Sequence, residues 1–87
     1  MKWKEDAGGQ SFTAYGSRGV GGAYRISWAA TRQPLSPDRA TTYYLYYWRG
    51  RGDGRLIGHA FSLPEARQRA EEHQARTKAA INAALGG

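Results

Sequence analysis

The sequence predicts an α+β fold in which an antiparallel sheet of three or four strands carries one C-terminal helix packed on one face. Ring-rich, β-forming segments separated by glycines fill the first two-thirds of the 87 residues, and a helical pattern fills the rest. A chain of this length has room for one domain, so 1–87 is expected to be a single domain. Its expected parts are an N-terminal arm or edge segment at 1–10, the sheet at 11–61 and the helix at 62–85.

The strand pattern is found in four segments. Ser11–Tyr15 is a short candidate strand, and Ala23–Ala30 alternates apolar and polar side chains, which is typical of a strand with one buried face. Residues 31–40 contain two prolines and a Ser-Pro-Asp turn sequence, which predicts a long loop. Residues 41–49 are dense in β-forming side chains, and residues 55–61 follow a glycine-rich hairpin turn as the last strand.

The helix has a start signal and one apolar stripe. The sequence Ser-Leu-Pro-Glu at 62–65 is a capping box, with Pro64 in the first turn, where its missing N–H costs nothing. Small and apolar residues then recur at spacings of three and four, at Leu63, Ala66, Ala70, Thr77, Ile81 and Ala84 or Leu85. Because alanine dominates this stripe, the bulk of the core must come from the sheet. The expected bulky core residues are Tyr24, Ile26, Trp28 and Leu45.

The positive charge is concentrated in the middle of the chain. The net charge is +6, and residues 15–61 hold seven arginines against Asp38 and Asp53. A positive field on a folded surface attracts phosphates or an acidic protein, and the planar guanidinium group suits either partner. A solvated, solubilising surface is the plainer interpretation of the same charge.

Three rings of the strand at 41–49 are expected on the sheet face away from the helix. If Leu45 points to the core, alternation places Tyr44, Tyr46 and Trp48 on the other face, beside Arg25. Rings interleaved with arginine suit base stacking, and the same mixture is enriched at protein interfaces. Two structural alternatives remain open: the rings form ordinary cross-strand pairs, or residues 1–10 fold over them.

The hairpin turn at 49–55 is the most basic short segment. Arg49, Arg51 and Arg55 are expected to contact a phosphate backbone as positioning contacts. A glycine-rich turn that needs polar flanks for solubility is the alternative interpretation.

Residue types that support catalysis or metal binding are scarce. The chain has no cysteine, which excludes disulfides and thiolate chemistry, and its two histidines lie in different elements. His59 is expected to be a half-buried strand residue, and His73 is expected to face water. The sequence therefore predicts no enzyme, no metal site and no cofactor. No apolar run approaches the ~20 residues of a membrane span, and the first residues lack a signal-peptide pattern, so no membrane contact is expected. The absence of cysteine makes the reducing cytoplasm the expected location.

The strand-to-helix junction resembles that of known small modules. Residues 56–66, Leu-Ile-Gly-His-Ala-Phe-Ser-Leu-Pro-Glu-Ala, are similar to the junction in plant ethylene-response DNA-binding domains and phage integrase arm-binding domains, which lay a three-stranded sheet in the major groove. Gly22-x-Tyr24-x-Ile26 and Tyr44-x-Tyr46 are similar to patterns in short phage and prophage proteins. The resemblance covers roughly residues 22–75, and its motifs largely encode a fold junction. The groove-reading Trp/Arg pattern of the plant domains is missing, so no base-contacting residue is carried over.

These observations favour a non-enzymatic nucleic-acid-binding module, for DNA or RNA. The candidate site consists of Arg25, Tyr44, Tyr46, Trp48, Arg49, Arg51 and Arg55. The alternative is a phage-encoded inhibitor of host defence, similar to anti-CRISPR proteins, that docks the same surface on an acidic part of a nuclease complex. A homodimer that seals the aromatic faces together is the third hypothesis.

Overall fold

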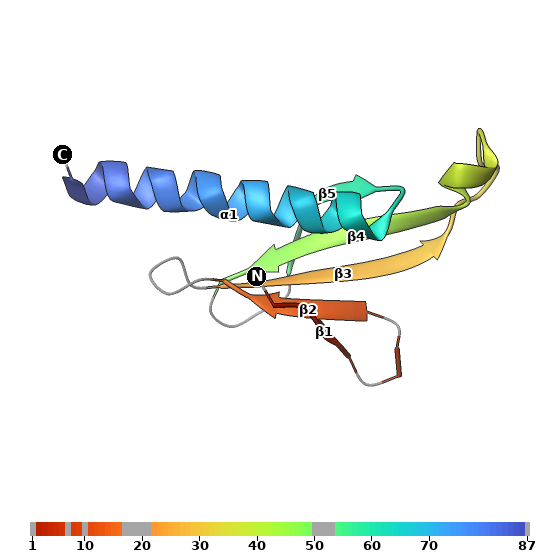
Figure 1. Cartoon of the computed structure of the whole chain (residues 1–87), viewed down its shortest axis with the longest axis horizontal. Coiled ribbons are helices and arrows are strands. Elements are labelled where there is room, and N and C mark those ends of the chain that lie inside the picture. The colour runs from red at the N-terminus through yellow and green to blue at the C-terminus, as the bar shows by residue number, and fades with distance from the viewer. Residues whose placement is uncertain (1, 7, 10, 17–21, 50–53, 87) are drawn as a thin grey trace.

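The computed structural model describes residues 2–6, 8–9, 11–16, 22–49 and 54–86. Within these residues the fold is α+β, with one antiparallel sheet and one C-terminal helix on one of its faces (Figure 1). The predicted fold class is confirmed, but the sheet has five strands, in the order β1-β2-β3-β4-β5, and not three or four. The elements are β1 (Lys4–Glu5), β2 (Ser11–Tyr15), β3 (Ala23–Ala30), the 3-10 helix η1 (Pro37–Arg39), β4 (Thr41–Trp48), β5 (Arg55–Ala60) and α1 (Leu63–Gly86).

The additional strand is β1, at one edge of the sheet. It pairs antiparallel with β2, with Lys4 opposite Thr13 and Glu5 opposite Phe12. Two residues are too few to show an alternation in the sequence, which is why the strand count was underestimated. The N-terminal segment therefore forms an edge strand that widens the sheet.

The centre of the sheet is the long β3–β4 hairpin. All eight residues of each strand are paired, from Ala23 opposite Trp48 to Ala30 opposite Thr41. The predicted loop at 31–40 connects them and contains η1. The Thr31 N–H donates to the carbonyl oxygen of Ala40 at 2.8 Å, which closes the loop at its base.

The core lies between α1 and the central strands. Tyr24, Ile26 and Leu45 are fully buried, as predicted, and Ala66 and Ala70 cover them from the helix. Alanine at both helix positions lets the helix approach the sheet closely, so the sheet supplies the bulk. Trp28 lies at the margin of this core and is half-buried, with its ring centroid 5.4 Å from that of Phe12.

The helix begins where the capping sequence predicts and continues past the strands. The Glu65 N–H donates to Ser62 Oγ at 3.3 Å, while the Glu65 carboxylate accepts a hydrogen bond from Arg69 at 2.9 Å. The C-terminal part of α1 extends beyond the end of the sheet (Figure 1). The predicted apolar stripe is consequently buried only in its first half, and Leu85 is 83% exposed.

Candidate aromatic and basic sheet face

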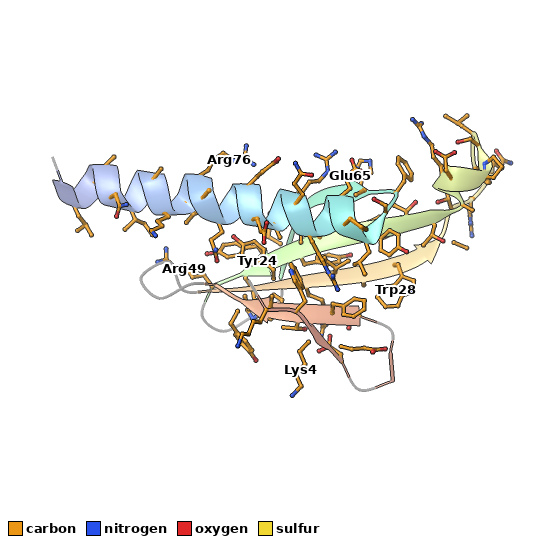
Figure 2. The ribbon with its side chains drawn as sticks, in the orientation of Figure 1. Lys4, Tyr24, Trp28, Arg49, Glu65 and Arg76 are labelled. Atoms are coloured by element: carbon orange, nitrogen blue, oxygen red, sulfur yellow. The ribbon has the colours of Figure 1, made fainter. Side chains whose placement is uncertain are left out.

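The two faces of the sheet carry different side chains. Tyr24 lies between the sheet and the helix, whereas Lys4 points away from the helix on the far side (Figure 2). The pairing register places Tyr44, Tyr46 and Trp48 on this far side, called the open face below. All three rings are half-buried, so they are neither sealed inside the protein nor fully exposed.

Cross-strand neighbours of the three rings alternate between small and basic. Ala23 lies opposite Trp48, Arg25 opposite Tyr46 and Ser27 opposite Tyr44. The structure therefore brings Arg25 and the three rings together on one face, as the alternation predicts. Ala23 is nevertheless only 2% exposed, so neighbouring atoms cover it despite its short side chain.

Asp6 positions Arg25 on this face. Its carboxylate accepts hydrogen bonds from the hydroxyls of Ser11 and Thr13, the latter at 2.9 Å, and lies 3.8 Å from Arg25 Nε. The two hydroxyl hydrogen bonds, followed by the charges of Arg25 and Lys4, hold the pKa of Asp6 below its usual value. Half of the Arg25 side chain remains exposed, at 53%, so its guanidinium group still has room for an external partner.

A hollow of about 900 Å³ lies at one end of the open face. It is bordered by rings from β2 and β4 and by basic side chains from β1 and β3. Its lining residues are Lys2, Trp3, Lys4, Glu5, Asp6, Thr13, Tyr15, Arg25 and Trp48. Tyr15 is 77% exposed there, and the sequence analysis missed it although the alternation in β2 places it on the same face as Thr13. The role of Asp6 had no sequence signal, because its partners lie five, seven and nineteen residues away.

The structure does not place the two described hairpin arginines, Arg49 and Arg55, in the column of rings. Arg55 is the first residue of β5 and lies opposite Tyr47, whose ring packs on the helix side of the sheet. Arg49 is exposed just beyond the end of β4 (Figure 2). Arg51 lies outside the described residues. Of the predicted basic residues, Arg25 is therefore the one that the described structure places directly among the rings.

His73 faces the sheet, so the prediction that it faces water is wrong. Its Nδ1 lies 2.6 Å from the hydroxyl oxygen of Tyr24, and its ring centroid lies 4.8 Å from that of Tyr47. It lies three positions after Ala70, so it belongs to the same helix stripe, and this spacing was the available signal. Burial, with the charge of Arg76, lowers the pKa of His73. Burial also raises the pKa of Tyr24 to about 12.

His59 is exposed on the open face, so the prediction of a half-buried residue is also wrong. A bulge between Leu45 and Tyr46 pairs Tyr46 with Leu56 and Leu45 with Gly58, which leaves Ile57 without a cross-strand partner in this register. The extra residue reverses the alternation, so Ile57 packs on the core while His59 lies opposite Tyr44. The two histidines therefore lie on opposite faces of the sheet. Among the described residues, no three or more His, Asp or Glu side chains are grouped as a metal site would require.

Comparisons with protein-family models, with curated proteins and with solved structures found no match to this chain. The resemblance to integrase arm-binding domains, plant ethylene-response domains and phage proteins stays a prediction. Within the described part of the chain, α1 is too polar to qualify as a membrane-crossing helix.

Proposed function

We propose that this protein is a non-enzymatic nucleic-acid-binding module that uses the open face of its sheet. The observation that carries the proposal is the column of Tyr44, Tyr46 and Trp48 on β4, half-exposed on the face that α1 does not cover. Adjacent aromatic rings provide π-faces on which successive bases can stack, and this stacking is largely independent of base identity.

Positive charge on the same face supports this proposal. Arg25 lies opposite Tyr46, and Lys4 extends from the edge strand on the same side of the sheet (Figure 2). The net charge of +6 would draw a polyanion towards the protein, and the local cations would contact phosphates beside the stacked bases. Affinity should therefore fall steeply as salt rises, because binding releases counterions from the nucleic acid.

The test is a titration of fluorescent single-stranded and duplex DNA and RNA at low and at physiological salt. Lys4→Gln should weaken binding and reduce the salt dependence, while Lys78→Gln, an exposed lysine on α1, should leave both nearly unchanged. The matched pair removes the same charge from two faces, so a general effect of net charge would appear in both. Absence of binding at low salt would refute the proposal, as would sedimentation as a dimer whose formation blocks the rings.

A further inference from the structure

We propose that Tyr15 and Trp48 form a slot that holds one unpaired base, which makes single-stranded nucleic acid the ligand of the open face. This inference rests on the nucleic-acid-binding function proposed above and adds the class of ligand. The slot consists of Tyr15 on β2, Ala23 on β3 and Trp48 on β4, which lie side by side in one row across the sheet.

The spacing of the row fits a planar ring. Neighbouring antiparallel residues have Cα atoms about 4.5–5.5 Å apart, so the Cα atoms of Tyr15 and Trp48 are separated by about 9–11 Å. A base between two rings needs about 7 Å between the ring planes, at ~3.4 Å for each stacked layer. Ala23 lies between the two rings in this row and is only 2% exposed, so neighbouring atoms already cover its methyl group, and the open space that both rings line is the hollow above it.

The two walls of the slot differ in exposure. Trp48 is half-buried, and its ring lies close to Gly54, where an added Cβ atom would be 3.3 Å from Trp48 Cε3. Tyr15, by contrast, is 77% exposed at the end of β2. A half-buried indole and an exposed phenol ring suit a stack in which a base lies on Trp48 and Tyr15 covers its other face.

Basic side chains around the slot are suitably placed to contact the phosphates on either side of the clamped base. Lys2, Lys4 and Arg25 line the same hollow, against Glu5 and Asp6. The Asp6 carboxylate accepts two hydroxyl hydrogen bonds and lies 3.8 Å from Arg25 Nε, so these two opposite charges offset each other and Lys2 and Lys4 supply the remaining positive charge, against Glu5. Lys4 lies opposite Thr13 on the open face, with Thr13 between it and Arg25, where it can contact the phosphate adjoining the clamped base.

Duplex nucleic acid is disfavoured by the same geometry. Both faces of each base in a duplex are covered by its neighbours, so a base must be unstacked and unpaired before it can enter the slot. A single strand presents separated bases at little cost. The slot therefore selects against double strands although the surrounding charge attracts both.

The experiment compares a short oligothymidylate with a duplex of the same length, using wild type, Tyr15→Ser and Tyr15→Phe. Tyr15 is exposed, so neither substitution should disturb the fold, which thermal denaturation checks. Wild type should prefer the single strand. Tyr15→Ser should weaken single-strand binding roughly 5- to 150-fold, the range expected for loss of one stacking ring, with little effect on the duplex. Tyr15→Phe keeps the ring and should retain the affinity.

The outcomes separate this inference from the function on which it rests. Equal affinity for both ligands, or wild-type affinity in Tyr15→Ser, would overturn the slot but leave the open face as a nucleic-acid-binding surface. No binding of either ligand at low salt would overturn both, as would binding of an acidic protein alone.

Discussion

Two tyrosines in the seam between helix and sheet should respond in opposite ways to loss of the same oxygen atom. Tyr24 and Tyr47 are neighbours, with ring centroids 4.8 Å apart, and both rings contact His73. The Tyr24 hydroxyl is hydrogen-bonded to His73 Nδ1 at 2.6 Å. The Tyr47 hydroxyl is buried and has no hydrogen-bond partner among the described residues. Substitution by phenylalanine removes one oxygen in each case, so the hydrogen bond is the main difference.

Tyr24→Phe should destabilise the protein. It leaves His73 Nδ1 without its partner, and an unsatisfied buried polar group costs about 1–3 kcal/mol. His73 is half-buried and can recover part of this loss from water, so about 1–2 kcal/mol is expected. For a domain of this size, each kcal/mol lowers Tm by about 4–8 °C, which gives a fall of about 4–16 °C.

Tyr47→Phe is the matched control. It removes a hydroxyl that gains nothing from burial, so Tm should stay unchanged or rise. Thermal and urea denaturation, followed by circular dichroism at about pH 8 where histidine is neutral, would measure both variants. An unchanged Tm for Tyr24→Phe, or equal losses in the two variants, would refute the assigned hydrogen bond.

Three further perturbations test other parts of the fold. Acid should lower the free energy of unfolding in two steps. The pKa of His73 is lowered from 6.5, so its contribution to stability is complete above that pH and is lost as pH falls through its folded-state pKa, and the lowered pKa of Asp6 adds a second loss of stability below pH 3.8. Urea denaturation at a series of pH values would measure both losses, and a stability independent of pH would contradict them. Ala70→Leu should overpack the seam and cost about 1–3 kcal/mol, whereas Ala79→Leu on the exposed side should cost little, and equal urea midpoints would count against the packing. Ser62→Ala should cost about 0.5–1 kcal/mol, because the capping bond is long, and an unchanged midpoint would show that the cap contributes nothing.

The parts of the fold that follow from local patterns could be predicted from the sequence. The alternation in β3 and β4 placed Tyr24 and Ile26 in the core and the rings of β4 on two faces, because successive side chains of a strand point in opposite directions. The cap at Ser62 marked the start of α1, because Ser is a favourable acceptor for the first unpaired N–H groups.

The parts that depend on contacts between distant residues could not be predicted. β1 is stabilised by pairing with β2, and its two residues carry no pattern of their own. The bulge at Leu45/Tyr46 reverses the side-chain alternation in β5, so strict alternation assigned His59 incorrectly. The ion pair between Asp6 and Arg25 depends on how β1 and β3 flank β2, a relation that only the folded sheet creates.

The candidate site was predicted in part, for the same reason. The strand period alone grouped Tyr44, Tyr46 and Trp48, since all three belong to one strand. Tyr15 joins them only because β2 lies two strands away in a fixed register, which brings it into the row of Trp48. Arg55 was assigned to the candidate site as part of the basic hairpin turn, but the register places it opposite Tyr47, on the helix side of the sheet.

The helix covers only one face of the sheet, so the residues that stabilise the fold and the rings proposed to bind nucleic acid lie on different faces. Five strands spaced about 4.8 Å apart span about 20 Å, whereas a helix with its side chains is about 10–12 Å wide, so α1 covers part of one face and none of the other. The helix packs on β3, β4 and β5, where the fully buried side chains lie. A ring on the open face contributes about 0.2–1 kcal/mol to the fold through cross-strand pairing, less than the ~1–3 kcal/mol available from stacking on a base. Substitution of Tyr44 or Tyr46 should therefore reduce affinity more than stability, and a larger loss of stability than of affinity would place the rings in a structural role.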